Sequence, residues 1–594
     1  MNPIALLSLD TKGRMLVLTP VEGGTLRRLE TSLQKKGFFT FTAMRGLRQV
    51  HAPVEQLESL CNALCDWDLR PDKRTETILQ ALQAARERHQ LGIVALRSLL
   101  AQEPGSLLVD YDGVDRLDPH QVLAVAALVH PDITGLCLFD EQGLGKTVTT
   151  LFSFDRLRKT GVQLTMIVVC PKNMLYEWSR DAARFFGRRY SVEVIAGSEK
   201  EKRRLLNKDA DIYVTNFETV GRLYLRLRNL VRSFNRRVLL AVDESFFVKN
   251  PAALRTRALR SLRREVARCV VLCGTPAPNS AHDLVEQFNI ADGGVTFAGV
   301  QVPVDRERAR QVVGDRIRTA GLYLRRLKSD VLPSLPSKTF HKVLVPLELE
   351  QERAYRAALL GLLRDLQDVD EVRFRKNIAS YLARRMALLQ ICSWPASVVD
   401  GYAQTPAKLT ALDGILQELV AHRGEKVVVW SFFTSSLDAI VRRYRDYNPV
   451  RCDGTVTNAQ DRREAVRRFQ EDQSTMIFVA NPAAAGAGIT LHRARYAVYE
   501  SMSNQAAHYL QSLDRIHRRG QERSVEYLLL LCDRTIELLE HDRLASKEAA
   551  AQQLLGDVVD PPTTRVSMLE EARAAAGLLE PLPSCGPAGD EDAQ

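Results

Sequence analysis

The stretch Asp140-Glu141-Gln142-Gly143-Leu144-Gly145-Lys146-Thr147 decides how the rest of this chain is interpreted. It follows an apolar run, residues 135–139, that is typical of a strand, and it precedes residues 148–157, which are typical of a helix. A strand, a glycine-containing loop and a helix in this order form a phosphate-binding layout. The stretch therefore predicts an α/β domain that binds a nucleotide.

The chemistry of the loop supports this interpretation. Glycines at 143 and 145 let backbone N–H groups surround a phosphate at a helix N-terminus. Lys146 would then meet the β and γ oxygens, and the Thr147 hydroxyl would meet a Mg²⁺ ion. The generic signature requires glycine at position 140, where this chain has aspartate, so the loop alone is also compatible with an ordinary loop-to-helix turn.

Size and composition limit the possibilities. With 594 residues, 45% of them hydrophobic and 26% charged, the chain is expected to form two to four globular domains. A formal net charge of +10 favours a polyanionic partner. The ten cysteines lack metal-ligand spacing and are interpreted as core residues in a reducing cytoplasm. No segment has the pattern of a signal peptide or a membrane span, so no membrane partner is expected.

Short, almost wholly apolar segments alternate with helical patterns between Asp112 and residue 292, which predicts a parallel sheet covered on both faces. The predicted strands are 135–139, 165–170, 211–215, 238–242 and 269–273. The α/β pattern resumes with predicted strands at 426–431, 476–480 and 496–499. Two such domains could form a cleft with nucleotide in it. Before them, residues 1–110 predict a small α+β domain, including a strand at 38–41.

The predicted strand 238–242 ends in Asp243-Glu244, which supplies the partner that the glycine loop requires. An aspartate at a strand end can hold Mg²⁺, and the adjacent carboxylate can orient or deprotonate the attacking water. Such a pair is otherwise commonly a helix cap. Its position after the loop favours the catalytic interpretation.

Several segments resemble the Snf2-type ATPases of helicase superfamily 2, over roughly residues 117–547. The family's loop has the form Asp-Glu-x-Gly-x-Gly-Lys-Thr, which residues 140–147 match throughout. Five segments follow the family's order, namely 117–121, 168–173 with Trp178, 214–216, 243–250 and 272–279. The resemblance implies two RecA-like lobes with helical Snf2-type protrusions, ATP with Mg²⁺, and double-stranded DNA as partner.

The resemblance also assigns roles to single residues. It implies that Gln121 reads adenine, and that Leu144, Gly488 and Gln511 belong to the nucleotide site with Gly143, Gly145, Lys146 and Thr147. Contacts to nucleic acid are implied for Lys172, Asn173, Thr215, Asn216, Thr275, Ser431 and Thr490. The match of residues 511–521 to the family's last motif implies that Arg515 and Arg518 reach the γ-phosphate from the second lobe. An arginine pair three residues apart on one helical face would otherwise be interpreted as a surface salt-bridge partner.

One departure from the family concerns coupling between hydrolysis and nucleic acid. Many relatives have histidine two residues after the acidic pair, where this chain has Phe246. A phenyl ring cannot make the hydrogen bonds of an imidazole, so the connection to the Gly274-Thr275-Pro276 loop is put in doubt.

The predicted organisation has five parts. These are an accessory domain (1–110), an ATP-binding lobe (111–292), an inter-lobe linker with helical protrusions (293–400), a second lobe (401–556) and a disordered acidic tail (557–594). The basic helix around Arg373, Lys376 and Arg385 is compatible with either a solvated face or a DNA contact. Within the family, residues 483–491 and Glu500 look most like the annealing-helicase (HepA-related) branch.

The predicted function is a DNA-dependent ATPase that translocates on duplex DNA as a monomeric motor. A strand-separating helicase and a non-hydrolysing DNA scaffold, acting with a nuclease or defence partner, are the alternatives. High arginine and alanine usage would suit a GC-rich bacterium or its phage.

Overall fold

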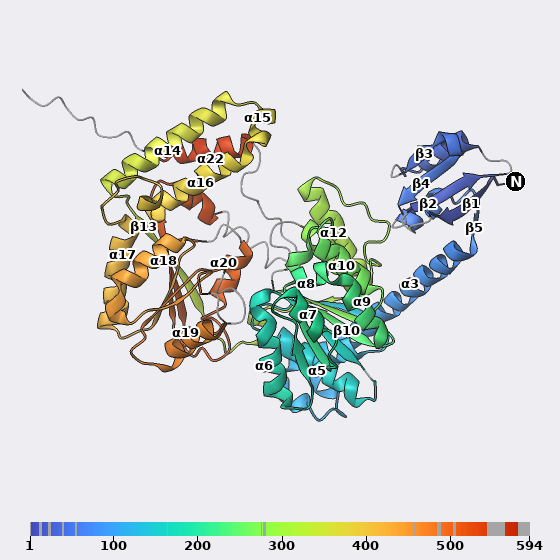
Figure 1. Cartoon of the computed structure of the whole chain (residues 1–594), viewed down its shortest axis with the longest axis horizontal. Coiled ribbons are helices and arrows are strands. Elements are labelled where there is room, and N and C mark those ends of the chain that lie inside the picture. Colours follow the sequence, from blue (N-terminus) through green and yellow to red (C-terminus); the bar gives the residue numbers. More distant parts are fainter. Residues whose placement is uncertain are drawn as a thin grey trace, which may run out of the picture. The chain divides into compact units, whose positions relative to one another are not determined.

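The computed structural model describes residues 2–10, 15–21, 25–38, 41–53, 56–162, 164–274, 276, 281–456, 459–483, 489–502, 506–542 and 565–579. The chain divides into two compact units, Met1–Leu327 and Lys328–Gln594 (Figure 1). Each unit has a parallel sheet of its own.

The first unit begins with a small α+β domain. Its five-stranded sheet has the order β3-β4-β2-β1-β5, with β1 and β5 parallel and the other pairs antiparallel. The strands are β1 (Ile4–Leu9), β2 (Met15–Pro20), β3 (Thr42–Met44), β4 (Gln49–Pro53) and β5 (Asp68–Pro71). Two helices, α1 (Leu26–Lys35) and α2 (Leu57–Ala63), contribute Leu29, Leu33 and Leu60 to the core of this domain. The Thr25 side chain caps α1. Of the predicted strand at 38–41, residues 39 and 40 lie outside the described residues, and Phe38 and Phe41 are not in a strand, since β3 begins at Thr42.

The large sheet of the first unit is entirely parallel, with the order β12-β6-β11-β10-β7-β9-β8. Its strands are β6 (Gly135–Leu138), β7 (Thr165–Cys170), β8 (Val192–Val194), β9 (Ile212–Asn216), β10 (Val238–Val242), β11 (Arg268–Leu272) and β12 (Tyr323–Leu324). The five strands predicted for this region are confirmed, whereas β8 and β12 were not predicted. Both are short, so their periodicity is weak.

Ten helices of the described residues accompany this sheet. They are α3 (Lys73–Leu100), α4 (Pro119–Val129), α5 (Lys146–Lys159), α6 (Leu175–Phe186), α7 (Glu199–Leu205), α8 (Phe217–Arg222), α9 (Tyr224–Ser233), α10 (Leu254–Arg263), α11 (His282–Asp292) and α12 (Arg306–Ala320).

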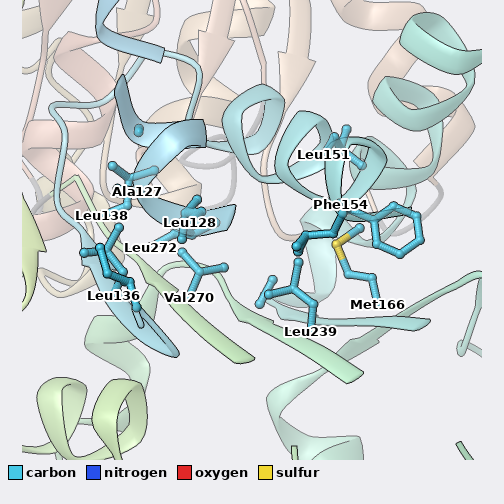
Figure 2. Packing of buried hydrophobic residues seen from close by; sticks show 14 of the residues in the cluster. Ala127, Leu128, Leu136, Leu138, Leu151, Phe154, Met166, Leu239, Val270 and Leu272 are labelled. Carbon is cyan, nitrogen blue, oxygen red and sulfur yellow. The ribbon is translucent and has the colours of Figure 1, made fainter. Parts of the chain in front are cut away.

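Both faces of this sheet are covered, which explains why most positions of its strands are apolar. Alternate strand residues such as Leu136, Leu239 and Val270 point toward α4 and α5, where they meet Leu128 and Phe154 (Figure 2). The opposite face is covered by α8, which contacts β7 and β9, and by α11, which contacts β6 and β11. The carboxyl ends of the parallel strands therefore share one edge that neither helical layer covers.

The second unit has a six-stranded parallel sheet in the order β13-β18-β17-β14-β16-β15. Its strands are β13 (Lys338–Val345), β14 (Val427–Trp430), β15 (Val450–Cys452), β16 (Ile477–Ala480), β17 (Tyr496–Tyr499) and β18 (Val525–Cys532). The helices near it are α13 (Lys328–Val331), α17 (Ala407–Leu416), α18 (Thr434–Arg443), α19 (Ala459–Glu471) and α20 (Ala506–Leu513). Residues of α19 and α20 pack on one face, and those of α17 and α18 on the other.

A helical layer completes the second unit. It contains α14 (Leu349–Asp368), α15 (Glu371–Lys376), α16 (Ile378–Ser393) and α22 (Arg565–Gly577), and Figure 1 shows α22 beside α14 and α16. Met568, Leu569, Ala572 and Ala575 of α22 are buried in the core of this layer. The expectation that residues 557–594 are disordered is therefore wrong for Arg565–Gly577. Alanine-rich composition hid an apolar helix face there.

Ion pairs also hold α22. Arg385 of α16 is buried, and its guanidinium contacts Glu540 at 2.5 Å and Glu571 of α22 at 2.7 Å. Among the residues described, none of the helices is both long and apolar enough to cross a membrane.

Deleting residues 565–594 should destabilise the helical layer, because it removes buried apolar side chains and one carboxylate partner of Arg385. Loss of a single buried leucine or methionine side chain costs about 2–5 kcal/mol, so we expect a loss of about 3 kcal/mol or more in the opening free energy of α14 and α16. Hydrogen exchange of these helices measures it. Deleting only residues 580–594 leaves α22 in place and is the control, and equal protection in the two truncated proteins would contradict the packing role of α22.

Candidate nucleotide site

The glycine loop lies at the carboxyl edge of the first large sheet. It follows β6 and leads into α5, which begins at Lys146. Gly143 and Gly145 have φ angles of 91° and 79°, a region that residues with a side chain rarely adopt. A Cβ atom on Gly145 would lie 2.2 Å from Nε2 of Gln121. The backbone conformation at 145 therefore favours glycine, whereas the close contact involves the end of the flexible Gln121 side chain.

Lys146 is largely buried, and its ammonium points into the loop. Nζ donates to the carbonyl oxygens of Asp140 at 2.8 Å and Glu141 at 3.3 Å, and to Oε1 of Gln142 at 3.2 Å. The Asp140 carboxylate is held by Arg326 through two hydrogen bonds of 2.8 and 2.5 Å. Aspartate at this position thus anchors the loop to the end of the first unit.

The acidic pair follows β10 at the same edge. Asp243 and Glu244 are each 3% exposed. Trp178 donates its indole N–H to Asp243 at 3.0 Å, and the backbone N–H of Glu244 donates to the other oxygen at 2.9 Å. Burial, followed by the charge of Glu244, raises the pKa of Asp243 to about 7. A cation bound there would relieve this cost.

Gln142 connects the acidic pair with the loop. Its side-chain amide donates to Oε1 of Glu244 at 2.8 Å while its carbonyl oxygen accepts from Lys146. The structure therefore brings Lys146, Asp243 and Glu244 together, as the sequence predicted, and adds Gln142 as the bridge. Sequence reasoning missed Gln142 because it stands at a position that the loop signature leaves open.

Gln121 occupies a defined position beside the loop. Its Oε1 accepts from the backbone N–H of Asp118 at 3.0 Å, and its Nε2 donates to the carbonyl of Leu144 at 3.2 Å. An amide has two N–H donors and two acceptor lone pairs, so this arrangement leaves one donor and one acceptor site for another group. Thr147 is half-buried at the second position of α5.

The residues expected to contact nucleic acid differ in exposure. Lys172 and Asn173 are exposed in the turn after β7. Thr215 has no exposed surface, and the Asn216 side chain caps α8 by accepting from the N–H of Thr219 at 2.9 Å. Thr275 lies outside the described residues. Trp178, expected beside Lys172 in a nucleic-acid loop, is instead buried against Asp243.

The arginines of the last motif lie in the second unit, after α20. This helix ends at Leu513, so the expectation that Arg515 and Arg518 share a helical face is wrong. The two side chains nevertheless converge, since both donate to the carbonyl of Ile489, at 3.4 and 3.2 Å. Arg518 also donates to Thr490 at 2.8 Å. Gln511 is buried on α20, and Gly488 lies outside the described residues.

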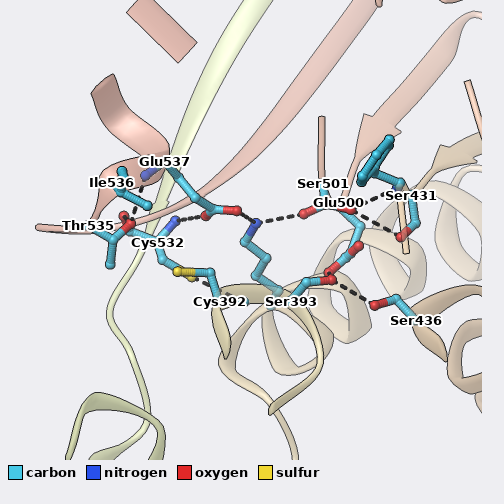
Figure 3. A network of polar contacts seen from close by, with 12 residues as sticks. Cys392, Ser393, Ser431, Ser436, Glu500, Ser501, Cys532, Thr535, Ile536 and Glu537 are labelled. Atoms are coloured by element: carbon cyan, nitrogen blue, oxygen red, sulfur yellow. Dashed lines mark hydrogen bonds and ion pairs between the residues drawn. The ribbon is translucent and has the colours of Figure 1, made fainter. Parts of the chain in front are cut away.

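Ser431 belongs to a buried polar network of the second unit (Figure 3). Its hydroxyl contacts Ser501 at 3.1 Å, next to Glu500. The Lys408 ammonium donates to the carbonyl of Glu500 at 2.7 Å and to the carboxylate of Glu537 at 2.6 Å. These bonds fix the ends of β14, β17 and β18.

The same network contains three groups at metal-ligand distance, Cys392, Cys532 and Glu537. The Glu537 carboxylate already pairs with Lys408, and burial raises the pKa of the Cys532 thiol. The pairing of Glu537 with Lys408 favours a structural role for this group. The expectation that the cysteines are core residues agrees with the burial of seven of those described.

The chain matches two family models. Residues 89–397 match the SNF2-related domain, and residues 407–520 match the helicase conserved C-terminal domain. Among curated proteins, it is 27% identical over 526 residues to the chromodomain-helicase-DNA-binding protein 1-like of Danio rerio, an alignment that covers 82% of this chain and 48% of that protein. It is 26% identical to the ISWI chromatin-remodeling complex ATPase ISW1 of Saccharomyces cerevisiae, covering 71% and 39%.

A further relative is an uncharacterized ATP-dependent helicase of Mycoplasma pneumoniae, with 24% identity, 71% of this chain and 40% of that protein. This chain thus spans less than half the length of these curated relatives. Among solved structures, the Sulfolobus solfataricus SWI2/SNF2 ATPase core in complex with dsDNA aligns with 23% identity, covering 77% of this chain and 96% of that one, with a TM-score of 0.34. Because the SNF2-related domain model matches more than half of the chain, the chain belongs to the Snf2-type ATPases of helicase superfamily 2.

Proposed function

We propose that this protein is a DNA-dependent ATPase that translocates on double-stranded DNA and thereby remodels DNA or protein–DNA complexes. The observation that carries this proposal is the junction at Gln142. One side-chain amide there contacts both the loop lysine, Lys146, and the second carboxylate of the acidic pair, Glu244. A lysine for phosphate and a carboxylate for water at such close range are the parts that phosphoryl transfer to water requires.

ATP with Mg²⁺ fits the residues present. The loop has two glycines with positive φ directly before the N-terminus of α5, a layout suited to a phosphate, and Lys146 supplies positive charge. Asp243 is a buried hard-oxygen ligand whose raised pKa shows that the anion lacks sufficient stabilisation. We assign Thr147 and Asp243 to Mg²⁺, and Gly143, Leu144, Gly145 and Lys146 to the phosphates.

The remaining roles follow from position. Glu244 would orient and activate the attacking water, and Gln121 would use its remaining donor and acceptor sites for adenine. Bound ATP supplies the phosphoryl group. Gln511 and Gly488 are proposed as second-lobe contacts to the nucleotide, and Arg515 and Arg518 as the groups that stabilise negative charge in the transition state.

Double-stranded DNA is the proposed partner. The ATPase core of Sulfolobus solfataricus was solved with dsDNA, and the name of the relative from Danio rerio includes DNA binding. In this chain, the exposed Lys172 and Asn173 are suited to phosphate contacts at the carboxyl edge of the first sheet. Further nucleic-acid contacts are proposed for Thr215, Asn216, Thr275, Ser431 and Thr490, and the net charge of +10 favours a polyanionic partner.

We further propose an accessory role for residues 1–110 and membership of the annealing-helicase (HepA-related) branch. The sequence of residues 483–491 and Glu500 supports this branch. A monomeric motor that works with a protein partner, such as a nuclease, would fit this assignment. A strand-separating helicase remains the alternative that the DNA experiments below distinguish.

Lys146→Ala should abolish ATP hydrolysis and weaken nucleotide binding, because it removes the positive charge that meets the phosphates. Glu244→Gln should instead leave ATP bound but uncleaved, because it affects only the activation of water. Steady-state hydrolysis and equilibrium binding of a fluorescent ATP analogue separate the two effects. Hydrolysis at near wild-type rate in either variant would contradict the assignment of the nucleotide site.

A motor on duplex DNA should displace the third strand of a triplex without unwinding a plain duplex. Its DNA contacts should be chiefly to phosphates, so binding should weaken steeply as salt is raised. Triplex displacement and duplex unwinding, measured side by side with ATP, test this prediction. Unwinding of a blunt duplex would favour the strand-separating helicase, and stimulation by RNA alone would contradict the choice of partner.

Replacing Arg515 or Arg518 by alanine should reduce kcat by about 10³- to 10⁵-fold, the usual contribution of an arginine that stabilises the transition state. The dissociation constant for nucleotide should change by about tenfold or less, because ground-state binding depends on the first unit. Single-turnover hydrolysis in saturating duplex DNA measures the first quantity, and analogue binding measures the second. Arg523, an exposed arginine paired with Glu425, provides the matched control variant Arg523→Ala. Wild-type hydrolysis in both test variants would return Arg515 and Arg518 to a structural role.

A further inference from the structure

A chain of hydrogen bonds connects the acidic box to the Gly274–Pro276 loop at a position where relatives are expected to use histidine. The hydroxyl of Ser245, the residue after Glu244, donates to Oε1 of Gln287 at 2.6 Å. Nε2 of Gln287, on α11, donates to the carbonyl of Pro276 at 2.5 Å and to the carbonyl of Asp283 at 2.8 Å. One glutamine thus joins two motifs that are more than thirty residues apart.

This connection is buried and directional. Ser245 and Gln287 have no exposed surface, so water does not compete for their hydrogen bonds. The Gln287 amide donates to Pro276 and Asp283 and accepts from Ser245, which fixes the orientation of its planar group. A displacement of the Pro276 carbonyl therefore costs a buried hydrogen bond unless Gln287 and Ser245 move with it.

Phe246, at the position where relatives are expected to have histidine, makes aromatic contacts. Phe246 stacks on Phe247 with ring centroids 4.6 Å apart, and Phe247 stacks on Phe217 at 5.4 Å. This aromatic stack anchors the backbone after the acidic pair without a polar contact from the ring. The polar connection lies one residue earlier, at Ser245.

The Gly274–Pro276 loop also lies close to Gln142, which in turn contacts Glu244. A Cβ atom on Gly274 would lie 2.5 Å from Oε1 of Gln142, the residue that donates to Glu244. Glu244 itself has a left-handed backbone, with φ of 50°. Such a conformation is costly for a residue with a side chain and depends on its surroundings. Small movements of the loop can thus act on Glu244 from the Gln142 side and from the Ser245 side.

We propose that Gln287 is a positioning residue that couples the Gly274–Pro276 loop to Glu244 through Ser245. This inference rests on the proposed function, and it concerns how DNA regulates hydrolysis. When DNA shifts the loop, Gln287 transmits the shift to Ser245 and so to the backbone that aims the Glu244 carboxylate. Phe246 cannot make the hydrogen bonds of a histidine, and in this proposal Gln287 connects the acidic pair with the loop instead.

The test is Gln287→Met, which keeps the volume of the side chain and removes its three hydrogen bonds. The ratio of DNA-stimulated to basal hydrolysis should fall by about fivefold or more, the lower end of usual coupling between sites. Binding of the ATP analogue should keep its Kd. A purely structural role would lower the thermal midpoint and leave the ratio unchanged.

Gln351→Met is the matched control. Gln351 is equally buried, donates to the carbonyls of Ile391 and Cys392 and accepts from the N–H of Ala407, but it lies in the second unit. The same loss of buried hydrogen bonds there should lower stability and preserve the stimulation ratio. A reduced ratio in Gln351→Met equal to that in Gln287→Met would overturn the proposal.

Ser245→Ala provides an independent test, because it removes one hydroxyl and little else. If the connection is a single path, Ser245→Ala should reduce the ratio and the double variant should be no worse than Gln287→Met alone. Independent, additive effects would overturn the path, as would full stimulation in Ser245→Ala. Absence of DNA stimulation in the unmutated protein would contradict the proposed function itself. Normal stimulation in Gln287→Met would contradict only this inference.

Discussion

Burial of two adjacent carboxylates at the end of β10 is the constraint to which the first unit is adapted. Placing such charges out of water is costly, and the raised pKa of Asp243 shows that the cost is only partly offset. The indole of Trp178, the backbone N–H of Glu244 and the amide of Gln142 each donate to this pair. These donors come from α6, from the turn after β10 and from the glycine loop. The pair thus ties together segments that the parallel sheet brings to one edge.

In the second unit, the buried charge of Lys408 is paired with a carboxylate. Lys408 is fully buried, and although burial acts to lower its pKa, the surrounding negative groups, Glu537 first, raise the pKa overall. Its ammonium donates to a carboxylate and to a carbonyl oxygen, and the network extends through Ser393 to Ser436. These hydrogen bonds connect the ends of neighbouring strands, although Oε2 of Glu500 has no hydrogen-bond partner. The first unit keeps a buried carboxylate whose pKa is raised by burial, whereas the second pairs its buried ammonium with a carboxylate.

Much of the fold followed from local patterns. The strands that end at Leu138, Cys170, Val242 and Leu272 are almost wholly apolar, because a parallel sheet with two covered faces favours apolar residues, and this pattern was recognised. The short strand β12 could not be recognised, since two residues carry no periodicity. The helix α22 was missed because alanine-rich composition was given more weight than the spacing of its buried residues.

In the candidate site, too, some residues were predicted from the sequence and others were missed. Lys146, Asp243 and Glu244 were found because their chemistry is tied to fixed positions after strands. Gln142 and Gln287 were missed, because a neutral amide has no fixed role in a motif and acquires one only from its three-dimensional neighbours. The break of the helix before Arg515 was also missed. After this break, Arg515 and Arg518 donate hydrogen bonds to the carbonyl of Ile489, which is remote in sequence.

The boundary between the two units lies between two anchored side chains. Arg326 is held by Asp140 of the glycine loop, and Lys328, which is 4% exposed, contacts Asp514 at 2.5 Å and the carbonyl of His517 at 2.9 Å. Only Leu327 separates these two side chains along the chain. Asp514 directly precedes Arg515. The residues on both sides of Leu327 are therefore fixed by ion pairs, Arg326 to the glycine loop and Lys328 to the segment that leads into Arg515.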